Sequence, residues 1–212
     1  MNPGSLALYL VTDSDLIAGR DLVSVVCQAV EGGVTMVQLR EKHACTRDFV
    51  DIASRLKKAL EPTGIPLIIN DRIDIALAVD AEGVHIGQSD MPYQKARALL
   101  GPDKIIGLSV ESLDQVSDAN KLDVDYIGVS PVFSTPTKTD TSVPFGLTGL
   151  REAVRLSRHP VVGIGGMNLS TAADVMDCNA DGIAVVSAIM ASEDPLQSSK
   201  ELKSIVECHL HR

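Results

Sequence analysis

The stretch from residue 22 to residue 42, LVSVVCQAVEGGVTMVQLREK, contains the pattern that decides the fold. Apolar residues recur at helical intervals over residues 22–31, and the glycines at 32 and 33 are typical of a helix end. Residues 36–40 then form an apolar run with the length of a buried strand. The stretch therefore predicts a helix that returns the chain to a new strand parallel to the one before it.

The same alternation of strand and helix continues on both sides of this stretch. We expect strands at residues 7–12, 36–40, 67–70, 83–86, 105–109, 126–129, 161–165 and 183–187. We expect helices at residues 22–31, 49–60, 73–79, 94–100, 113–121, 147–157, 172–179 and 196–209.

Helix N-caps are expected at Asp21, Thr46, Ser112 and Ser170. Eight repeats predict one α/β domain, a (β/α)8 TIM barrel over residues 1–212. An open doubly wound sheet is the alternative, but no GxGxxG opens the first helix.

The composition restricts the class of protein and its partners. Apolar residues make up 45% of the 212 residues and aromatic residues only 3%, so we expect an aliphatic core such as buried parallel strands form. The formal net charge of −9 argues against a nucleic-acid partner, because binding to the phosphate backbone requires a basic surface. An anionic ligand would therefore be held by local cations, backbone N–H groups or a metal ion.

The cysteines and the apolar runs bear on the cellular compartment. Four widely spaced cysteines have no metal-ligand spacing, and the longest apolar runs fall short of a membrane span. The first residues do not show a basic region followed by an apolar region, which is the pattern of a secretion signal. We expect a cytoplasmic protein with no membrane partner, and the sequence allows a homo-oligomer.

Cationic and amide side chains leave the second expected strand on one face. Gln38, Arg40 and Lys42 alternate with Leu39 and Glu41. Successive side chains of a strand point to opposite faces, so the first three residues share one face and the other two share the opposite face. An amide, a guanidinium and an ammonium group suit a phosphate-bearing ligand. The alternative is a solvated strand end with a surface charge cluster.

Two carboxylates follow neighbouring strands. Asn70 and Asp71 end the third expected strand, and Asp90 follows the fourth. Adjacent strands lie roughly 4.8 Å apart, so the two carboxylates can share one ion, and oxygen ligands suit Mg²⁺. Alternatively, Asp71 caps the next helix and Asp90 is a turn residue before Pro92.

A Ser/Thr/Pro-rich segment follows the sixth expected strand. Thr135, Thr137 and Lys138 can close on a phosphate, while Pro136 stiffens the segment. The alternative is a flexible polar loop, and Lys138 could then act on a mobile lid.

The last two strands end in a pattern typical of phosphate binding. GIGG at residues 163–166 ends the seventh strand, and Val186 and Ser187 end the eighth. The loops after strands seven and eight commonly bind phosphate in TIM barrels. Ser109, at the end of the fifth strand, faces the same rim. His85 lies within the fourth strand, where a single histidine is more often a hydrogen-bonded core group than a catalyst.

These sites predict two anion-binding regions at one rim of the barrel. Two anionic substrates, one of them a diphosphate that chelates Mg²⁺, fit this arrangement. No activated serine or cysteine and no Asp–His couple is evident, which argues against a hydrolase triad. Metal- and lysine-assisted departure of diphosphate, followed by capture of the remaining fragment, is favoured.

Six ordered motifs resemble those of the thiamine-phosphate synthase family, and the resemblance runs almost end to end. They are VQLREK at 37–42, INDR at 69–72, GVHIGQSD at 83–90, TPTK at 135–138, GIGG at 163–166 and VVSA at 185–188. The resemblance implies a Mg²⁺-dependent transferase of thiamine biosynthesis. Such an enzyme joins hydroxymethylpyrimidine diphosphate to hydroxyethylthiazole phosphate and releases diphosphate.

The resemblance also implies roles for individual residues. The implied pyrimidine diphosphate site comprises Gln38, Leu39, Arg40, Glu41, Lys42, Asn70, Ser109 and Lys138, with Arg40, Lys42, Ser109 and Lys138 as the catalytic set. The implied thiazole phosphate site comprises Thr135, Pro136, Thr137, Gly166, Val186 and Ser187. Asp71 and Asp90 are the implied ligands of Mg²⁺.

Two departures from the family pattern and two competing functions accompany this resemblance. Val110 and Glu111 stand where relatives often have other residues, and Met167 stands where isoleucine is common. The competing functions are a thiazole tautomerase on the same barrel and a non-catalytic thiamine-phosphate binder. Retention of the two aspartates and Lys138 favours the synthase.

Overall fold

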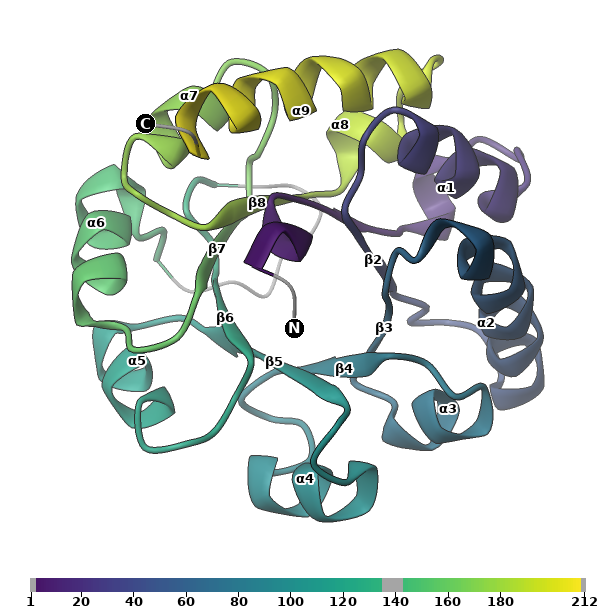
Figure 1. The fold of residues 1–212 in the computed structure, drawn as a ribbon, viewed down its shortest axis with the longest axis horizontal. Helices are drawn as coiled ribbons and strands as arrows, with labels where there is room; N and C mark the ends of the chain where they lie inside the picture. Colours follow the sequence, from purple (N-terminus) through teal and green to yellow (C-terminus); the bar gives the residue numbers. More distant parts are fainter. Residues whose placement is uncertain (1–2, 135–142, 211–212) are drawn as a thin grey trace.

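A closed barrel of eight parallel strands forms the centre of the molecule, with neighbours in chain order around the ring (Figure 1). The structure is a computed structural model that describes residues 3–134 and 143–210. The strands are β1 (Leu8–Val11), β2 (Met36–Leu39), β3 (Leu67–Asn70), β4 (Gly83–Ile86), β5 (Ile105–Val110), β6 (Tyr126–Val129), β7 (Val161–Ile164) and β8 (Gly182–Val185). The predicted TIM barrel is thus confirmed.

Helices surround the barrel and follow the strands in turn (Figure 1). They are α1 (Leu22–Glu31), α2 (Thr46–Leu60), α3 (Ile73–Ala78), α4 (Tyr93–Leu100), α5 (Leu113–Ala119), α6 (Gly146–Leu156), α7 (Ala172–Met176), α8 (Ser187–Met190) and α9 (Pro195–Leu210). Short 3₁₀ helices are η1 (Pro3–Leu6), η2 (Ser14–Leu16) and η3 (Glu61–Thr63).

Two apolar layers hold the barrel together. The larger layer lies between the sheet and the helices and consists mainly of Val, Ile, Leu and Ala. A smaller cluster fills the barrel interior and includes Tyr9, Met36, Ile68 and Tyr126. Leu6 of η1 is 1% exposed and belongs to this inner cluster, so η1 covers the end of the barrel where β1 begins. The C-terminal ends of the strands are left to form a site.

Polar side chains complete the hydrogen bonding at the N-terminal ends of the strands. Immediately before each even-numbered strand, a side chain accepts a hydrogen bond from a backbone N–H near the start of the preceding odd-numbered strand. The pairs are Thr35 with Leu8 at 2.9 Å, Glu82 with Leu67 at 2.9 Å, Asp125 with Ile106 at 2.9 Å and Asp181 with Val161 at 2.7 Å. These acceptors fix the strand starts, because a buried N–H without a partner is destabilising.

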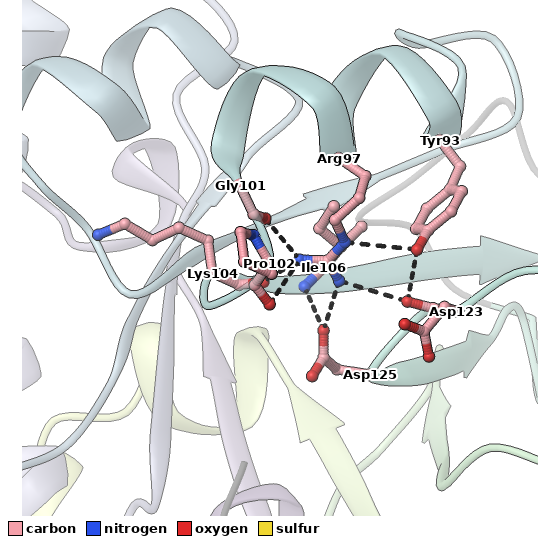
Figure 2. Close-up of polar contacts among 8 residues, drawn as sticks. All are labelled: Tyr93, Arg97, Gly101, Pro102, Lys104, Ile106, Asp123 and Asp125. Carbon is pink, nitrogen blue, oxygen red and sulfur yellow. Dashed lines mark hydrogen bonds and ion pairs between the residues drawn. The ribbon is translucent and has the colours of Figure 1, made fainter.

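Arg97 of α4 connects several elements at this same end of the barrel (Figure 2). Its guanidinium donates to the carbonyls of Gly101 at 3.1 Å and Lys104 at 2.6 Å, and to the Asp125 carboxylate at 3.2 Å. The cluster joins α4 to the starts of β5 and β6. Its place at the N-terminal ends of the strands assigns it to stability rather than to chemistry.

Several predicted boundaries and caps need correction. Asp21 and Ser112 cap α1 and α5 with their side chains, as predicted. Thr46 is instead the first residue of α2, whose N-cap is Cys45, and the predicted start at residue 49 missed an exposed polar first turn. Ser170 is not the cap of α7, because the N-cap is Thr171.

The end of β8 was also predicted wrongly. The strand ends at Val185, and Ser187 begins α8, a single turn too short to display a helical period in the sequence. The following helix, α9, is the one predicted over residues 196–209. At the end of β5, Val110 belongs to the strand and is fully buried.

None of the helices in the described part of the chain combines the length and the apolar character needed to cross a membrane.

Candidate active site

A cavity of about 520 Å³ lies at the C-terminal ends of the strands, and every strand or the segment just after it contributes to its lining. Ten of the residues predicted as site residues line it: Gln38, Arg40, Lys42, Asn70, Asp71, Asp90, Ser109, Gly166, Val186 and Ser187. These residues span 150 positions of sequence, from 38 to 187, and the barrel brings them to one rim.

Two predicted residues lie elsewhere. Leu39 is fully buried in the layer between the sheet and the helices. The Glu41 carboxylate accepts a hydrogen bond from the Ser14 hydroxyl. Their positions follow from the period-two alternation of β2, which turns their neighbours Gln38 and Arg40 toward the cavity.

Four predicted site residues, Thr135, Pro136, Thr137 and Lys138, lie outside the described residues.

The cations of the cavity stand at the end of β2. The Arg40 guanidinium approaches the Asp13 carboxylate at 3.6 Å, with both side chains less than one fifth exposed. The backbone N–H of Arg40 donates to the Thr12 hydroxyl at 3.0 Å, which fixes the strand end against β1. Lys42 is exposed at the rim. Arg40 is thus a positioned cation, and Lys42 is an exposed one.

The two carboxylates predicted as metal ligands meet at the ends of β3 and β4. The carboxyl groups of Asp71 and Asp90 lie close enough to influence each other's ionisation. Burial, and next this contact with Asp90, raise the pKa of Asp71 to about 6. Asn70 and Lys42 act in the opposite direction. Two carboxylates this close repel each other, and a cation held by both would relieve that repulsion.

The backbone explains how the two groups reach each other. Asp71 has a φ of 60°, in the left-handed region that aspartate tolerates better than most residues. Its N–H donates to the carbonyl of His85 at 2.9 Å, which joins the ends of β3 and β4. Asp90 accepts a hydrogen bond from the N–H of Gly87 at 2.6 Å, so the turn role considered for it is also present. The cap role considered for Asp71 is absent, because the N-cap of α3 is Arg72.

The donor set at Asp71 and Asp90 fits Mg²⁺. No group of three or more His, Cys, Asp or Glu residues that could hold a metal occurs in the described ranges 3–134 and 143–210. Mg²⁺ is usually held by one or two carboxylates, with water and substrate phosphates completing its coordination. Two adjoining carboxylates in a cavity with room for a ligand meet that requirement.

Glycines shape the opposite side of the cavity, at the end of β7. Gly165 has a φ of 100° and Gly166 a φ of 70°, which side chains rarely adopt. A Cβ at Gly166 would stand 2.8 Å from Cβ of Phe133, so no side chain fits there. A second hollow of about 490 Å³ adjoins this point and shares Gly166 and Ser187 with the main cavity.

A chain of side-chain hydrogen bonds across the cavity floor was not predicted. The Gln38 amide nitrogen donates to the Tyr9 hydroxyl at 2.7 Å, and the hydroxyls of Tyr9 and Tyr126 lie 2.8 Å apart. His85 Nδ1 lies 2.9 Å from the Tyr126 hydroxyl, and His85 Nε2 lies 2.8 Å from Oγ of Ser109. His85 is therefore hydrogen-bonded, as the sequence favoured. Tyr9 and Tyr126 occupy positions whose side chains alternate toward the inside of the barrel. A tyrosine at such a position in an apolar strand is the signal that could have found them.

The departures from the family pattern have simple places in the fold. Glu111 lines the cavity, and its N–H donates to the Gln115 side chain at 2.7 Å. Met167 lines the cavity as well and is 5% exposed.

This fold and cavity define a TIM-barrel enzyme with cations, paired carboxylates and a glycine loop at one rim. The sequence of residues 8–189 matches the family described as thiamine monophosphate synthase. A thiamine-phosphate synthase of Albidiferax ferrireducens is 54% identical over 203 residues, which cover 96% of this chain and 93% of the relative. One from Vibrio parahaemolyticus is 50% identical over 203 residues, covering 94% and 98%.

A solved structure agrees with these sequence relatives. A thiamine phosphate pyrophosphorylase from Pyrococcus furiosus superimposes with a TM-score of 0.90 at 40% identity, covering 98% of each chain. The chain belongs to the thiamine-phosphate synthase family, and it is an enzyme of that family.

Proposed function

We propose that the enzyme joins 4-amino-2-methyl-5-hydroxymethylpyrimidine diphosphate to 4-methyl-5-(2-hydroxyethyl)thiazole phosphate, or its carboxylated form. The products are thiamine phosphate and diphosphate, and the carboxylated form also releases CO2. The observation that carries the proposal is the contact between Asp71 and Asp90 in the cavity that Arg40 and Lys42 also line. A diphosphate ester needs this combination of carboxylate-held cation and basic side chains.

The pyrimidine diphosphate fits the side of the cavity formed by β2 to β5. Arg40 can bind two phosphate oxygens at once, and Lys42 adds a point charge at the rim. Asp71 and Asp90 would hold Mg²⁺ on the same diphosphate, where the ion would neutralise charge on the leaving group. Gln38, Asn70 and Ser109 offer hydrogen bonds to the rest of the substrate.

For the thiazole phosphate without a carboxyl group, bond cleavage and bond formation balance without a proton transfer. The bond between the methylene carbon and the diphosphate oxygen breaks, and its electron pair leaves with diphosphate. The thiazole nitrogen then gives its lone pair to the methylene carbon, and a C–N bond forms. Arg40, Lys42 and Lys138 would stabilise the charge that develops on the departing oxygen, which is where electrostatic catalysis is most effective.

The thiazole phosphate fits the glycine side of the cavity. Gly166 lets a phosphate approach the backbone closely, and Val186 and Ser187 stand at the start of α8, after β8. The ends of strands seven and eight are the recurrent phosphate site of this fold. Thr135, Pro136 and Thr137 are proposed to complete it.

The decisive experiment mixes both substrates with and without Mg²⁺ and follows the release of diphosphate. Release that requires both Mg²⁺ and the thiazole substrate is expected. Isomerisation of a thiazole without Mg²⁺ would support the tautomerase instead, and tight binding of thiamine phosphate without turnover would support a binding protein.

We also propose that residues 1–212 act as one catalytic domain in the cytoplasm. Four free cysteines, three of them exposed, support a reducing compartment. Association into a homo-oligomer is compatible with this proposal, since no step above needs a second copy.

A further inference from the structure

The floor of the cavity contains a layer of polar side chains where TIM barrels usually have branched aliphatic ones. Tyr9 and Tyr126 are 1% and 0% exposed, and His85 is 9% exposed. Burial raises the pKa of both tyrosine hydroxyls well above its usual value, so both keep their protons. A buried polar layer is no more stable than a well-packed apolar one, so it calls for a functional explanation.

Neighbouring strands leave room for this layer. A Cβ at Gly107 would lie 2.1 Å from Cζ of Tyr126 and 2.5 Å from Nδ1 of His85. A Cβ at Gly128 would lie 3.3 Å from Cε1 of His85. The contact between the histidine and the tyrosine thus depends on the absence of a side chain at Gly107.

With the amide nitrogen of Gln38 facing Tyr9, the hydrogen bonds between these groups can all run in the same direction. The amide nitrogen of Gln38 can only donate, so the Tyr9 hydroxyl accepts from it. We assign the proton of Tyr9 to the bond with the Tyr126 hydroxyl, which lies within hydrogen-bond distance. Tyr126 then donates to Nδ1 of His85, which places the proton of the neutral ring on Nε2. Nε2 donates to Oγ of Ser109.

Gln38 and Ser109, at the two ends of this series of hydrogen bonds, therefore offer opposite groups to a ligand. With its nitrogen occupied by Tyr9, Gln38 has its carbonyl oxygen left as an acceptor. With its oxygen accepting from His85, Ser109 has its hydroxyl proton left as a donor. Both side chains line the cavity. The reverse direction would place the histidine proton on Nδ1 and turn the Gln38 amide over, so that Gln38 would donate to the ligand and Ser109 would accept from it.

We propose that Tyr9, Tyr126 and His85 are positioning residues that fix the direction of this hydrogen-bond chain, so that Gln38 accepts and Ser109 donates. The cavity then selects a heteroaromatic ring with an amino donor and a ring-nitrogen acceptor. The corresponding oxo ring, which presents a carbonyl acceptor and a ring N–H donor, is disfavoured. This inference rests on the proposed function, because it assigns the pyrimidine ring to the cavity floor.

Substitution of tyrosine by phenylalanine removes the hydroxyl from this series of hydrogen bonds while keeping the packed ring. Tyr126→Phe and Tyr9→Phe each interrupt the chain, and the Gln38 amide is then free to turn over. We measure kcat/KM for the aminopyrimidine diphosphate and for its 4-oxo analogue. The preference for the amino substrate is expected to fall about tenfold or more in each variant, since a site without a fixed donor and acceptor loses discrimination.

Tyr93→Phe is the matched control, because Tyr93 is the third of the three tyrosines and lies outside the cavity. Its hydroxyl donates to the carbonyl of Asp123 at 2.7 Å, beside Arg97 (Figure 2). This variant is expected to keep the wild-type preference. A parallel loss of activity on both substrates in Tyr9→Phe and Tyr126→Phe, with an unchanged ratio, would overturn the inference.

A second measurement does not depend on turnover. Nitrogen-15 NMR of the histidine rings, with His85→Asn to assign the signal, reports which nitrogen of His85 is protonated. The proton is expected on Nε2, and Tyr126→Phe is expected to change the tautomer ratio. A proton on Nδ1 in the wild type contradicts the inference. Absence of diphosphate release by the wild type would instead contradict the proposed function and leave this NMR test in force.

Discussion

The carboxyl groups of Asp71 and Asp90 interact at the ends of the adjacent strands β3 and β4, and Asp90 helps to raise the pKa of Asp71. A proton on Asp71, or a cation held by both groups, relieves the repulsion between the two carboxylates. The pKa of Asp71, raised to about 6 by burial and by Asp90, means that the pair loses its proton within the range where enzymes work. Proton and metal therefore compete for the same oxygens.

The first prediction concerns the pH dependence of metal activation. Mg²⁺ needs Asp71 ionised, so its apparent affinity is expected to be constant above about pH 7. Below pH 6 the half-saturating Mg²⁺ concentration should rise by about tenfold per pH unit. Diphosphate release, measured over a series of Mg²⁺ concentrations from pH 5 to pH 8, checks this. A half-saturating concentration independent of pH would exclude Asp71 from the metal site.

The second prediction concerns stability without metal. The pKa of Asp71 rises from 3.8 to about 6 on folding, so protonated Asp71 favours the folded state and that contribution is lost as the pH rises through 6. Asp71→Asn cannot ionise, and in chelator its Tm at pH 8 should exceed that of the wild type by about 2–4 °C, or roughly 1 kcal/mol, after screening at this partly exposed site.

Two comparisons test the cause of that difference. At pH 4 the wild type and Asp71→Asn should melt together, because both then have a neutral group at this position. Mg²⁺ at pH 8 should raise the Tm of the wild type and leave the variant nearly unchanged. Equal melting curves at both pH values would refute the coupling between the two carboxyl groups.

The third prediction separates the two anion sites. Gly166→Ala places a Cβ 2.8 Å from Cβ of Phe133 at a φ of 70°. The displaced loop should raise KM for the thiazole phosphate by about tenfold or more while KM for the pyrimidine diphosphate changes little. Gly101→Ala is the matched control, because Gly101 has a φ of 77°, no atom within 4 Å of its Cβ position, and no part in the cavity. Equal effects of Gly166→Ala on both substrates would contradict separate sites.

The fourth prediction rests on the sequence motif, since Lys138 lies outside the described residues. Lys138→Ala should lower kcat by about 100-fold or more and affect substrate KM values less, because the charge that the lysine meets develops only as the bond breaks. Lys95→Ala, at an exposed position of α4, is the control and should behave as the wild type. A change confined to KM would make Lys138 a binding residue.

The sequence was sufficient for features that depend on local period and chain order. The alternation in β2 separated Gln38 and Arg40 from Leu39, and the structure places them as that period requires. Because the barrel strands follow chain order, Asp71 and Asp90 could be assigned to adjacent strand ends before any coordinates were known.

The cavity floor could not be predicted in the same way. Tyr9 and Tyr126 are 117 residues apart and stand on strands β1 and β6, which are not neighbours in the sheet. Their hydroxyls meet only because the barrel closes, so no local pattern contains the pair. The single turn of α8 was missed for a different reason, since four residues are too few to display a helical period.

The fifth prediction concerns the end of the barrel opposite the cavity. Arg97→Met keeps much of the side-chain volume but removes the donors to the carbonyls of Gly101 and Lys104 and to the Asp125 carboxylate. Partly buried acceptors without partners should destabilise the fold by about 1–3 kcal/mol, which lowers the Tm of a chain of this size by roughly 2–12 °C. Because this cluster holds the starts of β5 and β6, kcat and both KM values at 25 °C should remain at the wild-type level. Calorimetry together with steady-state kinetics checks both parts, and a loss of kcat without a loss of Tm would show that α4 acts on the cavity rather than on stability.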